Sequence, residues 1–258
     1  PVSRRRFIAI TAAAGACARP DFSLAAKPGT YTWRGVALGA EASLTLEHSD
    51  PVAARSAIEA CLAEVARLEA IFSLHRQDSA LARLNADGRL EDAPADLRLL
   101  LAEALSLAKR TDGAFDPTIQ PLWRLYAGHF ERPNADPSGP APQDIAQARR
   151  LVDWRCVAID DMGIRLIEKG MAITLNGMAQ GYITDKVGDL LRGRGFEHVL
   201  VNMGEQLAIG PKWPGKSWTI GIADPARPDR LLDTIELTDG AAATSAGAGL
   251  YFDATRRF

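Results

Sequence analysis

The chain has 258 residues, of which 47% are hydrophobic and 24% charged, and its formal net charge is -2. This composition is that of a globular protein with one large domain or two small ones. The charge balance argues against a nucleic-acid-binding face, which needs an excess of basic residues. No apolar run approaches the roughly 20 residues of a membrane span. The cysteines Cys17, Cys61 and Cys156 lack the spacing of metal ligands.

Residues 1–26 have the order of an export signal. The stretch "SRRRFIAITAAAGACA" begins with an arginine cluster, continues with a short apolar run and ends in small residues, as secretory signals do. A frayed basic tail, the alternative, does not explain this order. Residues 3–8 resemble the twin-arginine export motif, so we expect a periplasmic protein that is cleaved after Ala25 or Ala26.

A lipid anchor is a second interpretation of the same segment. The tetrad Ala14-Gly15-Ala16-Cys17 is a weak lipobox, in which the cysteine would carry the lipid. Contact with a membrane is expected only if Cys17 is lipidated, because nothing else in the sequence would hold the protein there.

Residues 27–258 alternate between strand and helix patterns. Residues 32–48 predict one long or two short strands, and residues 51–72 and 95–113 predict helices. In the first of these helices one face is apolar, formed by Ile58, Leu62, Val65, Leu68 and Phe72. Gly113 is typical of a helix end. Residues 131–142 are rich in proline and predict a surface loop.

The second half of the chain predicts short strands around one further helix. Turn residues separate the apolar runs, and a helical pattern of apolar residues covers 179–192. The predicted strands are 156–159, 164–168, 171–175, 198–204, 206–210, 217–224 and 231–237. Because antiparallel turns are mixed with long helices, the sequence predicts a single α+β domain with mixed antiparallel sheets packed against those helices.

The stretch "TDGAFDPTIQPLW" at 111–123 has two interpretations. Asp116 followed by Pro117 is typical of an N-cap and a first helical residue. The alternative is that Ala114, Phe115 and Asp116 present backbone and a carboxylate to a ligand. Upstream, at 72–85, His75 is most simply a surface residue, and Asp78 or Ser79 is the cap of a short helix.

The stretch "ITLNGMAQGYITDK" at 173–186 places Asn176-Gly177 between an apolar run and a helix. The N-terminus of a helix has free N–H groups and favours an anion. Gly177 and Gly181 do not form a dinucleotide fingerprint and no Walker lysine follows, so a phosphate site and a simple tight corner both remain. "AAATSAGAG" at 241–249 could approach a ligand through its backbone or be a flexible loop.

The order and spacing of these short motifs resemble the ApbE family of FAD:protein FMN transferases, from about Val36 to the C-terminus. The Leu-Asn-Gly-x-Ala-Gln-Gly-Tyr form and the export signal look most like the NosX branch, which accompanies nitrous oxide reductase in denitrifying bacteria. The motifs that carry the resemblance are Phe72-Ser73 with Asp78-Ser79 and Leu84-Asn85, Gly113 to Thr118, Leu175 to Tyr182, Leu200 to Glu205, and Ala243 to Ser245.

The resemblance implies an activity, cofactors and a site. Such enzymes bind FAD and Mg²⁺ and attach FMN to a Thr or Ser of an acceptor flavoprotein. The acceptor carries an Asp-x-x-Ser/Thr-Gly-Ala-type motif and, in the NosX context, would be a membrane-bound regulator of nitrous oxide reduction. The Gly177 carbonyl would be a metal ligand. The FAD contacts would be Leu38, His75, Ala114, Phe115, Asp116, Thr174, Gln180 and Ala243.

This sequence departs from the family at several positions. The family usually has Asp at the position of Thr174 and often Lys at that of Gln180. It also continues past a stretch like "YFDATRRF" into a His-x-x-Asp-Pro-x-Thr-Gly motif that holds the catalytic His and further metal ligands. We therefore expect the chain to be truncated at its C-terminus, and no catalytic residue is assigned.

The sequence is also compatible with two other functions. The first is a periplasmic FAD-binding maturation protein without transfer activity, which the departures would fit. The second is a substrate of flavinylation, but the acceptor motif does not occur, since "TSAGAG" places Ala after the Ser. The codons after Phe258 would separate the first alternative from the transferase.

Overall fold

The computed structural model describes residues 23–24, 29–37, 39–224 and 227–244. Most of the predicted export signal, with Cys17, and the predicted FAD contact Leu38 lie outside these residues. The described chain forms two compact units. The first contains the segments up to Arg67 and from Gln180 onward, and the second contains Leu68–Ala179. No helix of the described part is both long and apolar enough to span a bilayer.

The first unit is built on a six-stranded sheet with the order β1-β2-β3-β7-β8-β11, in which all neighbours are antiparallel. Its inner face is apolar because alternate residues of a strand share a face; in β3, Ala42, Leu44 and Leu46 are buried. Residues 32–48, predicted as one or two strands, form the hairpin of β2 and β3. The strands are β1 Ser23–Leu24, β2 Thr30–Ala37, β3 Ala40–Glu47, β7 Val199–Asn202, β8 Gln206–Ile209 and β11 Gly240–Ala242.

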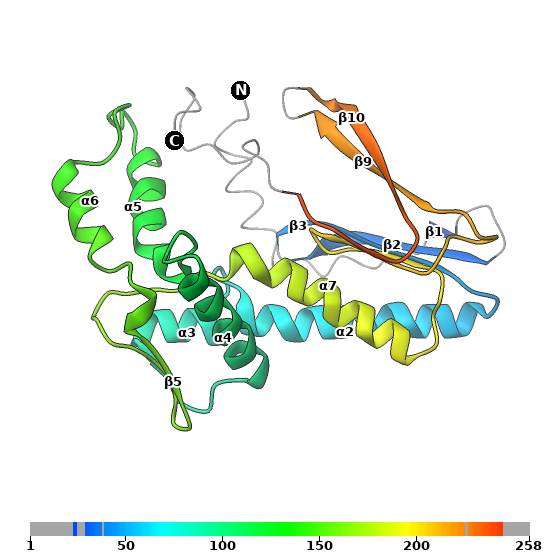
Figure 1. The fold of residues 1–258 in the computed structure, drawn as a ribbon, viewed down its shortest axis with the longest axis horizontal. Coiled ribbons are helices and arrows are strands. Elements are labelled where there is room, and N and C mark those ends of the chain that lie inside the picture. The colour runs from blue at the N-terminus through cyan, green and yellow to red at the C-terminus, as the bar shows by residue number, and fades with distance from the viewer. Residues whose placement is uncertain (1–22, 25–28, 38, 225–226, 245–258) are drawn as a thin grey trace. The chain divides into compact units, whose positions relative to one another are not determined.

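Two long helices accompany this sheet (Figure 1), α2 (Pro51–Phe72) and α7 (Asn176–Gly193). Gly188 lets α7 approach β8 closely, because a Cβ there would overlap the side chain of Leu207. Just beyond α7, Arg194 donates to the Ser56 carbonyl of α2 over 3.2 Å. Thus α7 lies against the sheet and beside the N-terminal half of α2.

A separate two-stranded ribbon completes the first unit. It consists of β9 (Trp218–Asp224) and β10 (Arg227–Leu237), paired antiparallel. The register shifts twice near Leu231, which is typical of β-bulges. The indole of Trp218 donates to the Gly210 carbonyl over 3.0 Å and fixes the start of the ribbon.

The second unit is mainly helical, with a small antiparallel sheet of order β4-β6-β5. Its core contains Leu81, Leu84, Leu97, Leu101, Ile164 and Ile173, all fully buried. Ser79 is the N-cap of α3 and accepts from the Ala82 N–H, as predicted. The elements are α3 Ala80–Asp87, β4 Arg89–Leu90, α4 Ala95–Arg110, η2 Pro117–Ile119, α5 Gln120–Phe130, α6 Pro142–Arg149, η3 Trp154–Cys156, β5 Val157–Asp160 and β6 Gly163–Leu166.

The α+β class is confirmed, but several elements differ from the prediction. Residues 171–175, predicted as a strand, belong to no sheet, and α7 begins at Asn176 rather than at 179. The helix predicted over 95–113 ends at Arg110, since Asp112 and Gly113 have positive φ values of 49° and 80°. A helix start at Asp116-Pro117 was one of two interpretations, and η2 with α5 forms there, whereas α6 was not predicted. A proline in the first turn of α5 and of α6 is compatible with a helix start.

Candidate functional site

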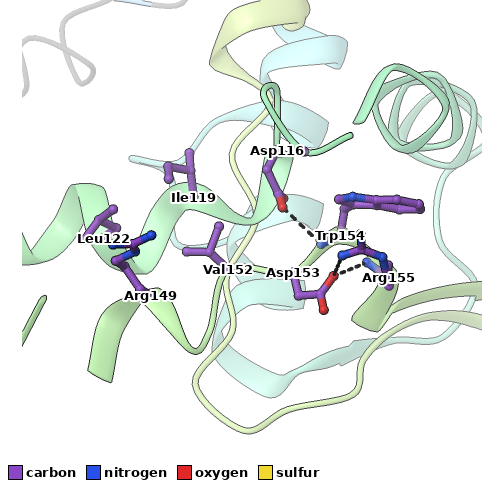
Figure 2. A pocket seen from close by; sticks show the side chains of 9 residues that line it. Asp116, Ile119, Leu122, Arg149, Val152, Asp153, Trp154 and Arg155 are labelled. Carbon is purple, nitrogen blue, oxygen red and sulfur yellow. Dashed lines mark hydrogen bonds and ion pairs between the residues drawn. The ribbon is translucent and has the colours of Figure 1, made fainter. Parts of the chain in front are cut away.

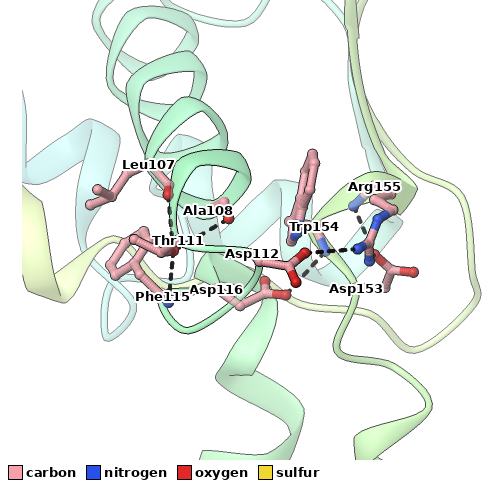
Figure 3. A network of polar contacts seen from close by, with 9 residues as sticks. All are labelled: Leu107, Ala108, Thr111, Asp112, Phe115, Asp116, Asp153, Trp154 and Arg155. Atoms are coloured by element: carbon pink, nitrogen blue, oxygen red, sulfur yellow. Dashed lines mark hydrogen bonds and ion pairs between the residues drawn. The ribbon is translucent and has the colours of Figure 1, made fainter.

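The loop that joins α4 to η2 is organised by Thr111 (Figure 3). Its hydroxyl donates to the Leu107 carbonyl over 2.9 Å and accepts from the Phe115 N–H over 3.1 Å. The Gly113 N–H donates to the Ala108 carbonyl over 2.9 Å. With Asp112 and Gly113 both left-handed, the chain reverses within a few residues. The predicted FAD contacts Ala114 and Phe115 are therefore held in a defined backbone conformation.

Asp116 has a structural role in this loop. One carboxylate oxygen accepts from the Thr118 N–H over 2.8 Å and from the Thr118 hydroxyl over 2.6 Å. The other oxygen accepts from the Trp154 N–H over 3.1 Å. The predicted N-cap is thus confirmed, and the carboxylate also joins η2 to η3. Both oxygens therefore bind protein groups, and the contact of Asp116 with FAD stays a prediction.

A pocket of about 360 Å³ lies beside the Asp116 carboxylate (Figure 2). Its charged residues are two arginines and two aspartates, so the lining has no net formal charge. This volume is at the lower end for small-molecule sites and suits a part of a large ligand rather than the whole of it. The lining residues are Gly113, Asp116, Ile119, Leu122, Arg149, Val152, Asp153, Trp154 and Arg155.

Trp154 contributes an unusual polar group to this region. Its indole N–H is buried and has no hydrogen-bond partner within the described residues, and a Cβ on Gly113 would lie 3.8 Å from it. Arg155 stacks on the Trp154 ring at 4.9 Å and pairs with Asp153 at 3.1 Å and Asp112 at 3.7 Å. A buried donor without a partner is uncommon, and no motif in the sequence pointed to Trp154.

Asn85 and Pro117 fix the segment that leads into α7. The Asn85 amide donates to the Ile173 carbonyl over 2.8 Å and accepts from the Ile173 N–H over 2.6 Å. The next residue, Thr174, donates its N–H to the Pro117 carbonyl over 2.8 Å. These bonds replace the strand pairing predicted for 171–175. They also bring Thr174 next to the residues that follow Asp116.

Gly177 lies close to the same loop. A Cβ on Gly177 would be 3.7 Å from the Phe115 ring, an ordinary van der Waals contact. Four of the predicted site residues, Phe115, Asp116, Thr174 and Gly177, are thus gathered in the second unit around one loop and one helix start. At the opening of α7 the Asn176 N–H donates to the Thr174 hydroxyl over 3.3 Å and the Met178 N–H to the Leu175 carbonyl over 2.9 Å, so an anion there would be favoured mainly by the helix dipole.

In the first unit the turn between β7 and β8 gathers the remaining motifs. Gly204 has a φ of 100° and a Cβ there would lie 2.5 Å from the Gln180 Nε2. The buried Thr184 hydroxyl donates to the Gln180 carbonyl over 2.8 Å and lies 3.5 Å from the Glu205 carbonyl. Gln180, a predicted FAD contact, therefore packs on the Asn-Met-Gly-Glu turn.

Ala243 follows the end of β11 and lies beside the same turn. β11 pairs with β8 so that Ala242 is opposite Gln206, and continuing this register places Ala243 opposite Glu205. The Glu205 carboxylate accepts from the Thr244 N–H over 3.3 Å. Glu205 belongs to the Leu200–Glu205 motif, but its contact with Thr244 could not be predicted, because it depends on the register of two strands.

His75 is exposed in the loop between α2 and α3, where its N–H lies 3.2 Å from the Ser73 hydroxyl. The contacts described above do not bring it to the loop at Asp116. Its predicted contact with FAD, like that of Leu38, stays a prediction.

The described residues alone do not form a magnesium site. Gly177 lies in the first turn of α7, where its carbonyl accepts along the helix axis. No group of three or more His, Cys, Asp or Glu side chains that could hold a metal ion occurs in the described ranges. One neutral carbonyl does not provide the near-octahedral oxygen coordination that Mg²⁺ prefers.

Comparison with known proteins assigns the chain to a family. The model of the ApbE family matches residues 38–258, so the chain belongs to the ApbE family. Among solved structures, the ApbE protein from Thermotoga maritima is similar with a TM-score of 0.72 and 30% identity, over 84% of this chain and 71% of that one.

Curated relatives show the same family relationship. The FAD:protein FMN transferase of Treponema pallidum (strain Nichols) is 30% identical over 190 residues, 65% of this chain and 51% of that protein. The enzyme of the same name from Haemophilus influenzae is 28% identical over 207 residues, 76% of this chain and 58% of that protein. The chain thus spans little more than half the length of these relatives.

Proposed function

We propose that this chain is part of an FAD:protein FMN transferase. The observation that carries the proposal is the gathering of Phe115, Asp116, Thr174 and Gly177 by the contacts of Asn85 and Pro117. These residues come from motifs far apart in the sequence, and the family resemblance assigns all of them to FAD or its metal. Curated relatives of similar sequence bear this enzyme name.

In the proposed reaction a Thr or Ser hydroxyl of the acceptor attacks the FMN phosphorus of FAD. The new bond joins the hydroxyl oxygen to that phosphorus, the pyrophosphate P–O bond breaks, the hydroxyl proton is lost and AMP leaves. In the second unit the backbone of 114–116 and the side chain of Thr174 bind and orient FAD, and a contact from Gln180, in the first unit, stays a prediction. When bound, Mg²⁺ would neutralise charge on the pyrophosphate.

The described residues fit the cofactor better than the metal. The backbone of Ala114–Asp116 is fixed, and the start of α7 favours an anion, so a phosphate-bearing ligand suits the second unit. For Mg²⁺ only the Gly177 carbonyl is inferred. We propose that the remaining coordination comes from FAD phosphates and from groups outside the described residues.

The cellular setting is proposed from the sequence. The arginine pair near the N-terminus supports twin-arginine export to the periplasm, with lipidation of Cys17 as an alternative. The NosX-like form of the Leu175–Tyr182 motif supports an acceptor flavoprotein of the nitrous oxide reduction system. Such an acceptor would carry the Asp-x-x-Ser/Thr-Gly-Ala-type motif.

A covalent-transfer assay tests the proposed function. The protein, expressed from its complete gene so that any segment after Phe258 is included, is incubated with FAD, Mg²⁺ and a flavoprotein domain that bears the acceptor motif, and the mixture is then denatured. Flavin fluorescence that stays with the acceptor band, together with AMP release, supports the transferase. FAD binding without either product would instead support the alternative of a non-catalytic FAD-binding maturation protein.

A further inference from the structure

The turn at Gly204-Glu205 links the two predicted cofactor contacts described in the first unit. On one side Gln180 packs over Gly204, where a Cβ would lie 2.5 Å from its Nε2. On the other side the Glu205 carboxylate holds the Thr244 N–H over 3.3 Å. The family resemblance assigns FAD contacts to Gln180 and Ala243 but no role to Glu205.

The fold explains why residue 205 can act on this loop. β8 begins at Gln206, and β11 ends at Ala242 directly opposite it. The pairing of β8 with β11 therefore ends before residues 243 and 244, which continue beside Glu205. The glutamate side chain supplies the acceptor that the next strand residue would otherwise supply. A carboxylate is well suited to this, since hydrogen bonds to a charged group are stronger than neutral ones.

The turn itself is fixed from several directions. The Asn202 side chain accepts from the Gly204 N–H over 3.1 Å, and the Met203 N–H donates to the Glu205 carbonyl over 3.1 Å. The Thr184 hydroxyl ties the turn to α7. The backbone of Glu205 thus belongs to a turn held by several hydrogen bonds, so its carboxylate can fix the position of the residues that follow β11.

We propose that Glu205 is a positioning residue that holds Ala243 and Thr244 in the conformation that binds FAD. The inference rests on the proposed function, because it assumes that Ala243 contacts FAD. The Gln180 side chain carries no charge, so it does not compete with the Thr244 N–H as an ion-pair partner of the Glu205 carboxylate.

Amide hydrogen exchange tests the contact without FAD. The variants are Glu205→Ala, Glu205→Gln and, as a control, Glu197→Ala, which changes an exposed glutamate just before β7. We expect faster exchange at the Thr244 amide in Glu205→Ala only, because the glutamine keeps an acceptor oxygen. Unchanged exchange in Glu205→Ala would overturn the proposal.

FAD affinity, measured by calorimetry on the same variants, tests the consequence. Loss of one hydrogen bond should weaken FAD binding by roughly 2- to 10-fold in Glu205→Ala, with the melting temperature of the FAD-free protein little changed and with Glu205→Gln close to the wild type. Faster exchange with unchanged FAD affinity would overturn the positioning role. If the wild-type chain binds no FAD, the proposed function fails, and this role fails with it, while the exchange result still decides whether the Glu205–Thr244 contact exists.

Discussion

The side chain of Asn85 forms with the backbone of Ile173 the two hydrogen bonds that a neighbouring strand would otherwise form. Both the N–H and the carbonyl of Ile173 are engaged, over 2.6 and 2.8 Å, by a residue 88 positions earlier. Ile173 is fully buried, so these backbone groups have no access to bulk water. One amide therefore satisfies a buried peptide and places Thr174 beside the Asp116 loop.

Replacement of Asn85 by alanine should destabilise the protein strongly. It would leave a buried donor and a buried acceptor unsatisfied, each costing about 1–3 kcal/mol, so we expect the free energy of unfolding to fall by about 2–4 kcal/mol. Urea denaturation measures the change. Gln147→Ala on α6 is the matched surface control and should stay within about 0.5 kcal/mol. An equally small change in Asn85→Ala would contradict the role given to this amide.

Gly204 and Gly215 have similar left-handed backbone conformations, so alanine variants of the two can be compared. Their φ values are 100° and 95°, but only at Gly204 would a Cβ meet another residue, the flexible end of Gln180. Alanine at either position should lower the free energy of unfolding by about 1–2 kcal/mol. Only Gly204→Ala should also displace Gln180 and weaken FAD binding. Equal FAD dissociation constants for the two variants would show that Gln180 does not contact the cofactor.

Asp116→Ala should lower both stability and FAD affinity. Loss of the cap costs about 0.5–2 kcal/mol, and the bond to the Trp154 N–H is lost as well. We expect a fall in melting temperature similar to that in Ser79→Ala, which likewise removes a cap together with one further hydrogen bond, from the Ser79 hydroxyl to the Ser73 carbonyl. The Asp116 variant should also bind FAD more weakly, because the backbone of its loop moves. A variant that melts earlier but binds FAD with wild-type affinity would make Asp116 a helix cap only.

The thiol of Cys61 should resist alkylation in the folded protein. Burial is the main cause that raises the pKa of this thiol from 9.0 to about 12. The thiol therefore stays neutral at pH 8.5. Because the thiolate is the form that reacts with alkylating agents, the folded protein should react slowly. We expect iodoacetamide to modify Cys61 only in urea, with peptide mass mapping to separate it from Cys17 and from the half-buried Cys156. Rapid modification in buffer would show that the site opens locally.

The same pKa shift has a consequence for stability at high pH. The unfolded chain loses the Cys61 proton near pH 9 and the folded chain only near pH 12, so the folded state binds more protons between these values. The contribution is complete below pH 9 and is lost as the pH rises from 9 to 12. Cys61→Ala should remove this part of the pH dependence of unfolding.

Export should depend on the arginine pair. We expect a variant with Arg4→Lys and Arg5→Lys, expressed behind a start methionine, to accumulate as precursor in the cytoplasm, since the twin-arginine route reads both arginines. Cell fractionation and immunoblotting measure the distribution. Normal periplasmic levels of the double variant would argue for another export route.

Local sequence patterns correctly predicted the elements that follow from apolar periodicity and helix capping. The helix over 51–72 follows from its apolar face, and the caps at Ser79 and Asp116 follow from side chains that bond nearby N–H groups. The apolar run at 171–175 was misread as a strand because its partner is the side chain of Asn85, which no local pattern reveals. An asparagine inside a helix is unfavourable for propensity, and this was the one available signal of its tertiary role.

The site, too, was predicted only where local motifs reveal it. The segments at 114–116 and 174–177 were recognised from their motifs, but their proximity depends on the bond from Thr174 to the Pro117 carbonyl. Glu205 could not be predicted, because its contact with Thr244 requires the β8–β11 register. Trp154 lies outside the recognised motifs, and its indole N–H, which has no partner in the part of the chain that the structure describes, is visible only in three dimensions.

The discontinuity of the first unit has a consequence for synthesis on the ribosome. β3 pairs with β7, with Leu44 opposite Val201, and the whole of the second unit is translated between these strands. Until β7 emerges, the hairpin of β2 and β3 has an open edge at β3. Open strand edges are templates for intermolecular pairing. The nascent chain is therefore expected to be most prone to aggregation, and most dependent on chaperones, in the interval between the emergence of β3 and that of β7.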